Sequence, residues 1–297
     1  MSSDTNINNL LGMARTAELG GNTQEATNYY NRVLEIDPGV YEAWIGKGKA
    51  AGWQSTLVNF RLAEMAIAFT NAIGAAPAEE KETVTEQIVN EANKIVVALY
   101  GMARGHLEEF ASLDNIWPTY LVQIGQLLDT MDQVLTWLPM NRNTLENIVH
   151  FCKDNIEGYS YRDQFNNNLP GLHGITPQYE QLLRMKLENA ITALRRIDPS
   201  YTPPAIEKKS ADACFVVTAT MGDFHHPRVT LLRRFRDDWI LKQSWGEGFV
   251  RHYYAVGPKV AGVIAPRPIL RSISYRFLVL PASWIATRLL KQASPVA

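Results

Sequence analysis

The sequence predicts a mainly α fold, in which a helical-repeat array is followed by a small, mostly helical C-terminal domain. Two segments near the start share one spacing of small, aromatic and proline residues. Apolar residues farther along recur at intervals of three and four, as on one face of a helix. The charge balance also reverses near residue 213. With 297 residues, 46% of them hydrophobic and 20% charged, the chain can bury a packed core.

Two segments near the start of the chain form an internal repeat, and a repeat of fixed period indicates an array of similar structural units. One copy contains "ATNYYNRVLEIDPGV" and the other contains "MAIAFTNAIGAAP". The matching positions are Ala26, Tyr30, Val33 and Pro38 in the first copy, and Phe69, Ala72 and Pro77 in the second. Upstream, Leu10, Met13 and Ala14 correspond to Trp44, Lys47 and Gly48.

This pattern resembles the tetratricopeptide repeat. The resemblance implies pairs of antiparallel helices over residues 5–200, with small residues such as Ala14 and Gly48 where two helices approach closely. Two features depart from the family pattern. The two prolines lie 39 residues apart rather than the usual ~34, and Lys47 stands where leucine is expected.

Grooves in tetratricopeptide proteins are lined by the first helix of each pair, so the resemblance also implies a peptide-binding surface here. The six candidate residues are Asn8, Leu11, Arg15, Glu42, Ile45 and Lys49. The family's arrangement of basic residues for a C-terminal carboxylate is missing. Arg15 and Lys49 still allow contact with an acidic peptide, and the alternative is a scaffold whose charges are only solvated.

The centre of the chain reads as further amphipathic helices. One apolar stripe runs from Ile88 to His106 and another from Leu121 to Leu138, and we expect Asn143 to cap a third helix that carries Cys152 on its core face. Residues 157–176 are predicted to be a long loop. A further helix follows, and "TPPAIEKKSAD" marks a linker at residues 201–212.

The C-terminal part, residues 213–291, resembles the CFI-box C-terminal domain, a bacterial module. The matching motifs are "CFVVTATMG", "HPRVTLLRRFRD", "GFVRHYY" and the Gly-Pro of "YAVGPKVA". The resemblance implies a shared fold but no activity.

Cys214 suggests one alternative function, a cysteine-dependent enzyme. A thiolate nucleophile needs a base within reach, and His225 or His226 are the candidates for that role. Against this hypothesis, Cys214 begins the apolar run "FVVTAT", which favours a buried packing role, and His226-Pro227 is also a common way to start a helix. No second cysteine lies nearby to complete a zinc site. We therefore expect no metal and no cofactor.

The basic tail suggests another alternative, a peripheral membrane-acting effector. From Cys214 onward there are 12 Lys and Arg against 4 Asp and Glu, a balance of +8, whereas residues 1–213 hold 17 bases and 26 acids, a balance of −9. An apolar stripe of Leu270, Ile273, Phe277, Leu280 and Trp284 lies among cations that are candidates for membrane or anion contact. These cations are Arg267, Arg271, Arg276, Arg288 and Lys291. The alternative is that the stripe packs against the segment that Cys214 begins.

The hypothesis favoured by the sequence is an interaction protein, an adaptor that holds a peptide or protein in its repeat groove and carries a basic C-terminal docking module. We do not expect a nucleic-acid partner, because no recognised motif accompanies the positive charge. Two cysteines, no signal-peptide pattern and no apolar run long enough for a membrane span predict a cytoplasmic protein. Under the membrane alternative it attaches peripherally to the inner membrane face.

Overall fold

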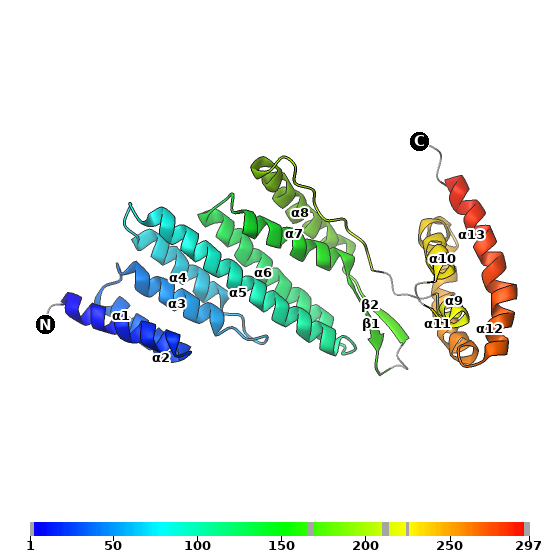
Figure 1. The fold of residues 1–297 in the computed structure, drawn as a ribbon, viewed down its shortest axis with the longest axis horizontal. Helices are drawn as coiled ribbons and strands as arrows, with labels where there is room; N and C mark the ends of the chain where they lie inside the picture. Colours follow the sequence, from blue (N-terminus) through cyan, green and yellow to red (C-terminus); the bar gives the residue numbers. More distant parts are fainter. Residues whose placement is uncertain (1–2, 166–168, 210–213, 224–225, 294–297) are drawn as a thin grey trace. The chain divides into compact units, whose positions relative to one another are not determined.

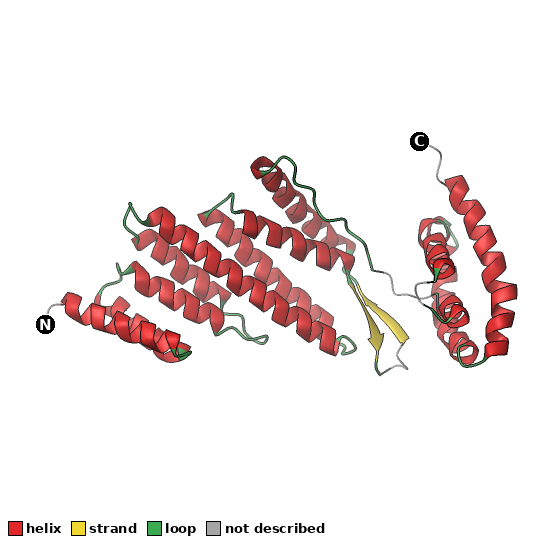
Figure 2. Ribbon diagram, viewed as in Figure 1, coloured by secondary structure: helices red, strands yellow, loops and turns green. Residues whose placement is uncertain are grey.

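The structure is a computed structural model that describes residues 3–165, 169–209, 214–223 and 226–293. Helices dominate these residues, and the strands form one two-stranded sheet, so the predicted mainly α fold is confirmed (Figure 2). The chain divides into two compact units. The first comprises Met1–Tyr159 and His173–Lys208, and the second comprises Ser160–Leu172 and Lys209–Ala297.

The first unit holds eight helices within its described residues. They are α1 (Ser3–Leu19), α2 (Thr23–Ile36), α3 (Tyr41–Trp53), α4 (Leu62–Ala75), α5 (Lys81–Phe110), α6 (Ile116–Trp137), α7 (Arg142–Glu157) and α8 (Pro177–Ile197). Helices that follow one another in sequence pack together as α1 with α2, α3 with α4, α5 with α6, and α7 with α8 (Figure 1). Helix α2 also packs on α3, which joins the first two pairs.

Side-chain caps fix where several of these helices begin. The Asn22 side chain accepts a hydrogen bond from the Glu25 amide at the start of α2, and Thr176 accepts one from Tyr179 at the start of α8. The expected cap at Asn143 is wrong. Helix α7 begins earlier, and Asn141 Oδ1 accepts from the Thr144 amide at 2.9 Å.

Glycines on α3 bring it unusually close to its neighbours. A Cβ atom at Gly46 would lie 2.0 Å from the ring of Tyr30 on α2, and one at Gly48 would lie 2.5 Å from the ring of Phe69 on α4. Real Cβ atoms do not approach other atoms so closely, so only glycine allows these contacts. Small residues therefore set the spacing of the first four helices, as the repeat pattern predicted for Gly48.

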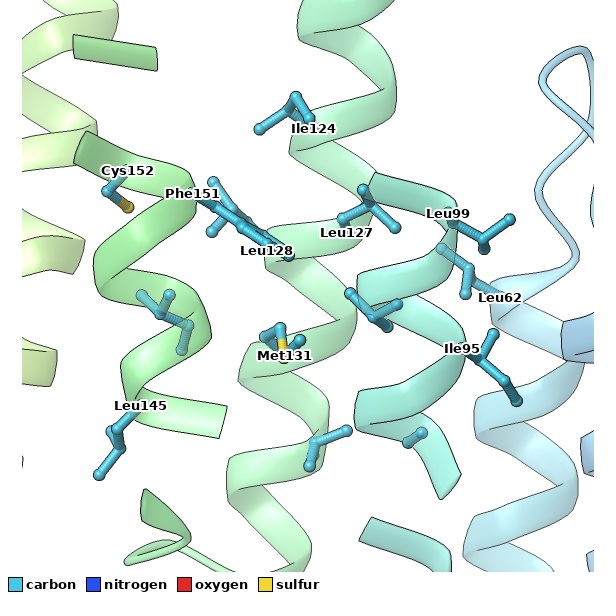
Figure 3. Packing of buried hydrophobic residues seen from close by; sticks show 14 of the residues in the cluster. Leu62, Ile95, Leu99, Ile124, Leu127, Leu128, Met131, Leu145, Phe151 and Cys152 are labelled. Atoms are coloured by element: carbon cyan, nitrogen blue, oxygen red, sulfur yellow. The ribbon is translucent and has the colours of Figure 1, made fainter. Parts of the chain in front are cut away.

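The main hydrophobic core of this unit runs from α3 to α8. Figure 3 shows part of it, with labelled side chains from α4 to α7. Leu127, Met131 and Phe151 are among its buried side chains, and Cys152 is fully buried, in the core-facing position expected from the sequence. The apolar stripe predicted on α5 is buried from Ile88 to Leu99, as expected. Beyond Leu99 the buried side of the helix lies at other positions than the predicted ones. Past Leu99 the buried residues are Ala103 and Leu107, while Met102 is exposed and His106 is only half-buried.

The long loop predicted at residues 157–176 is instead a hairpin. Strand β1 (Tyr159–Asp163) pairs with β2 (Leu169–His173). In the hairpin the ring of Tyr161 lies where Gly171 has no side chain, since a Cβ there would be 2.4 Å from it. Residues 201–208, the first part of the predicted linker, belong to the first unit, where Tyr201 and Ile206 pack against the core.

The second unit is helical apart from its part of the hairpin. Its helices are α9 (Phe215–Met221), α10 (Pro227–Asp238), the 3₁₀ turn η1 (Ile240–Lys242), α11 (Gly246–Ile264), α12 (Pro268–Ser274), the π-helical turn η2 (Tyr275–Val279) and α13 (Leu280–Ala293). Its core gathers Cys214 with Val229, Leu232 and Phe235 of α10, and with Val279 and Ala286. No helix within the described residues is long and apolar enough to cross a membrane.

The glycine contacts predict a difference between two Gly→Ala substitutions. Gly48→Ala forces a methyl group into the buried Phe69 ring, and such overpacking outweighs the better helix propensity of alanine by about 1–2 kcal/mol. Gly101→Ala on α5 meets nothing within 4 Å and therefore gains up to about 1 kcal/mol. Urea unfolding followed by circular dichroism measures both. A Gly48→Ala midpoint at or above the wild-type midpoint would show that α3 does not need its glycine.

Candidate functional site

A hollow of about 520 Å³ lies on the first unit, and four of the six predicted groove residues line it. Its lining residues are Arg15, Glu18, Tyr30, Tyr41, Glu42, Ile45, Gly46, Lys49, Glu79, Glu80, Thr83, Val84 and Gln87. They come mainly from α1, α3 and the start of α5, the first helices of the first three pairs. We refer to this surface as the α1–α3–α5 hollow.

The other two predicted groove residues lie elsewhere. Leu11 is 5% exposed and packs in the core between α1 and α2, together with Leu10 and Ala14. Asn8 is exposed on a separate shallow surface that Gly12, Thr16 and Tyr29 also line. At about 100° per residue, Asn8, Leu11 and Arg15 lie on one side of α1. Of the three, only Arg15 lines the hollow, so the shared helix side alone does not decide which residues reach it.

Both cations of the hollow are already paired with carboxylates. Arg15 Nη2 lies 3.2 Å from Glu42 Oε1, and Lys49 forms an ion pair with Glu18. Glu18 also accepts a hydrogen bond from the Tyr30 hydroxyl at 2.8 Å. Burial, reinforced by this bond and the charge of Glu18, raises the pKa of Tyr30 above its usual value, so Tyr30 stays protonated and donates.

The hollow consequently carries an excess of negative charge. Glu79 and Glu80 line it as well, and neither forms an ion pair within the described residues. Glu80 accepts a hydrogen bond from the Tyr41 hydroxyl, which raises the pKa of Tyr41 to about 12. Four glutamates thus face two cations. Sequence reasoning missed Glu18, Glu79 and Glu80, although they line the same hollow as four of the residues it named.

The second candidate site is the surroundings of Cys214. Its side chain is 6% exposed, and it stands at the start of α9 within the core of the second unit. His225 lies outside the described residues. His226 caps α10, where its Nδ1 accepts a hydrogen bond from the Arg228 amide at 3.2 Å.

The groups packed near Cys214 come from three motifs that are well separated in the sequence. The Val216 amide donates to the Tyr253 hydroxyl at 3.2 Å, and the Phe215 ring contacts both Tyr253 and Tyr254. Burial raises the pKa of Tyr253, and the neighbouring Cys214 adds to the rise.

A buried arginine completes this cluster. Arg236 forms a two-pronged bond with Asp237, at 2.6 and 2.9 Å, and its Nη1 donates to the Tyr254 hydroxyl at 2.9 Å. Its charge is therefore paired inside the second unit, as a buried guanidinium requires. Sequence reasoning did not single out Arg236 or the two tyrosines, but all three lie in the motifs that resemble the CFI-box domain.

The five basic residues predicted to contact a membrane or an anion differ in their surroundings. Arg271 is half-buried, and its Nε donates to the Thr220 carbonyl at 3.1 Å, where it closes the end of α9 beside Gly222. Arg267, Arg276 and Lys291 are exposed. Arg288 is also exposed, and its guanidinium carbon lies 3.9 Å from the centre of the Trp284 ring.

Within the described ranges, no three side chains of His, Cys, Asp or Glu lie close enough to hold a metal ion. Comparison of the chain with protein-family models, curated proteins and solved structures finds no match. The two family resemblances therefore rest on the sequence motifs alone and stay predictions.

The burial of both thiols predicts slow alkylation in the native state. Cys152 is fully buried, and burial raises its pKa to about 12, so almost none of it is thiolate at neutral pH. Cys214 has little access to solvent. Iodoacetamide is expected to modify both residues slowly in the native chain and quickly in denaturant, as peptide mapping by mass spectrometry can measure. Fast alkylation of Cys214 alone in the native chain would contradict its packing role and would support the hypothesis of a cysteine-dependent enzyme.

Proposed function

We propose that the protein is an interaction adaptor whose α1–α3–α5 hollow binds a basic peptide segment of a partner protein. The observation that carries the proposal is the charge of the hollow. Its two cations are held by Glu18 and Glu42, whereas Glu79 and Glu80 have no cationic partner within the described residues.

This charge pattern reverses the expectation of an acidic peptide. An acidic ligand would have to break the Arg15–Glu42 and Lys49–Glu18 pairs and then approach four carboxylates. A lysine or arginine of a partner can instead pair with Glu79 or Glu80 and leave both pairs in place. The ring of Tyr41, which also lines the hollow, offers a face for a cation.

The shape of the hollow also supports a peptide ligand. The helices α1, α3 and α5, which are the first helices of three successive pairs, all contribute to its lining. The hollow therefore suits an extended segment that crosses these helices. Ile45 and Val84 add apolar contact between the charged groups. Exposed ion pairs contribute modestly, about 0.5 kcal/mol each, so we expect a weak and exchangeable complex.

The test uses the full chain and two fluorescein-labelled peptides of equal length, one with lysines and one with glutamates at the same positions. The lysine peptide is expected to bind and the glutamate peptide is not. Glu79→Gln combined with Glu80→Gln removes two ion pairs, which weakens binding of the lysine peptide about fivefold by fluorescence anisotropy. Raising the salt concentration weakens it further.

A matched control separates the hollow from the general negative charge of residues 1–213. Glu35→Gln combined with Glu109→Gln removes the same charge from exposed positions on α2 and α5 outside the hollow. This control is expected to bind the lysine peptide nearly as well as the wild type. Equal weakening in both double variants, or preferential binding of the glutamate peptide, would refute the proposed ligand.

A further inference from the structure

An apolar face runs along α12, η2 and α13 of the second unit and is exposed. Ile269 is 75% exposed, Phe277 is 73% exposed and Trp284 is 58% exposed. Ile273, Leu278 and Ile285 on the same helices are each about half exposed. The side chains that these helices bury are smaller or lie on the other side, such as Ser274, Val279, Ser283 and Ala286. The stripe expected to pack against the segment begun by Cys214 therefore faces outward.

The charge around this face is positive. Arg267, Arg276, Arg288 and Lys291 are exposed on the same stretch, and the sequence has no acidic residue after Glu247. Arg288 lies over the ring of Trp284, so a cation and an aromatic group stand together at one end of the face. Exposed apolar side chains flanked by arginine and lysine match the interface of an anionic bilayer, with its acyl chains below and its phosphates above.

A hollow of about 550 Å³ adjoins Trp284 and has the groups that a lipid phosphate needs. It is lined by His226, Pro227, Arg228, Leu231, Leu280, Ser283, Trp284 and Thr287. Ser283 is 4% exposed, and its hydroxyl oxygen has no hydrogen-bond partner in the described part of the chain. A buried hydroxyl without a hydrogen-bond partner is costly, so Ser283 offers a donor that the described side chains leave unused. Arg228 and the start of α10 add positive charge beside it.

We propose that this face docks on a bilayer that contains anionic phospholipids. Phe277 and Trp284 enter the interface, Arg276, Arg288 and Lys291 contact the phosphate layer, and one lipid phosphate occupies the hollow that Ser283 and Arg228 line. This face belongs to the second unit and the α1–α3–α5 hollow to the first, and the proposal does not depend on the function of the hollow.

Charge argues against the other occupants of this face. A second copy that presented the same face would bring the same cations, and residues 248–297 contain no acid to pair with them. Docking on the acidic residues 1–213 of a second copy would instead appear in the test as self-association without lipid. Nucleic acid would be expected to meet aromatic stacking platforms, whereas much of the face consists of isoleucine and leucine.

The test is flotation of the full chain with vesicles. Binding is expected to vesicles of phosphatidylcholine that contain one part in three of phosphatidylglycerol, and not to phosphatidylcholine alone. Raising the salt from about 0.1 M to about 1 M shortens the screening length from about 10 Å to about 3 Å and should release most of the protein. Free glycerol phosphate is expected to compete poorly, because it cannot contact the apolar face.

Four variants probe the parts of the site. Arg276→Gln combined with Arg288→Gln is expected to weaken the partition coefficient roughly thirtyfold, about fivefold for each cation. Phe277→Ser and Trp284→Ser should each weaken it at least about tenfold through lost apolar burial. Ser283→Ala removes a phosphate donor and should weaken it about tenfold without lowering the melting temperature.

Matched controls lie on the first unit. Arg195→Gln combined with Arg196→Gln makes the same charge change at exposed positions of α8, and Ile67→Ser removes an exposed apolar side chain from α4. Both should bind vesicles as the wild type does. Equal binding to both vesicle types, or Phe277→Ser and Trp284→Ser binding like the wild type, would overturn the proposal. So would lipid-independent self-association that Phe277→Ser abolishes, and unchanged binding of Ser283→Ala would refute the phosphate site.

Discussion

The close approach of α3 to the helices around it is the constraint on which the first unit depends. The ring of Tyr30 lies over Gly46, the ring of Phe69 lies over Gly48, and Ile95 and Met65 lie over Gly52. No side chain fits at these three positions without a shift of its neighbours, so α3 sits at the centre of α2, α4 and α5. That position brings residues of α1, α3 and α5 to one surface. Helix packing thus creates the α1–α3–α5 hollow, and the charged residues that line it then determine which ligand it can bind.

The same packing orders the charges. Tyr30 reaches from α2 across Gly46, and its hydroxyl donates to Glu18, which in turn pairs with Lys49 of α3. One buried aromatic ring therefore links the core to the ion pairs at the surface. Because these pairs hold both cations, the carboxylates at the start of α5 define the charge that a ligand meets. The second unit has the opposite character, since its buried arginine is paired internally while its outer cations surround an apolar face.

The sequence predicted those features that depend on the local spacing of residues. It did not predict features that depend on which side of a helix packs against its neighbours. The repeat interval found the first two helix pairs and placed Arg15, Glu42, Ile45 and Lys49 correctly on one surface. It misplaced Leu11, because one apolar residue on α1 cannot be assigned to core or groove without knowing where α2 lies. At the tail the turn η2 inserts an extra residue, so the buried positions step from Ser274 to Val279. A regular stripe of threes and fours misses that step, so it could not predict that Val279 is buried while Phe277 and Trp284 are exposed.

The affinity of Gly46→Ala for the lysine peptide tests most directly whether helix packing creates the hollow. The added methyl group cannot share the space of the Tyr30 ring, so Tyr30 must move and release Glu18. Gly12→Ala on α1, where a Cβ meets nothing within 4 Å, is the matched control. The account predicts that Gly46→Ala keeps its helical circular dichroism and loses most of the peptide binding, while Gly12→Ala binds normally. Undiminished binding by a folded Gly46→Ala protein would contradict it.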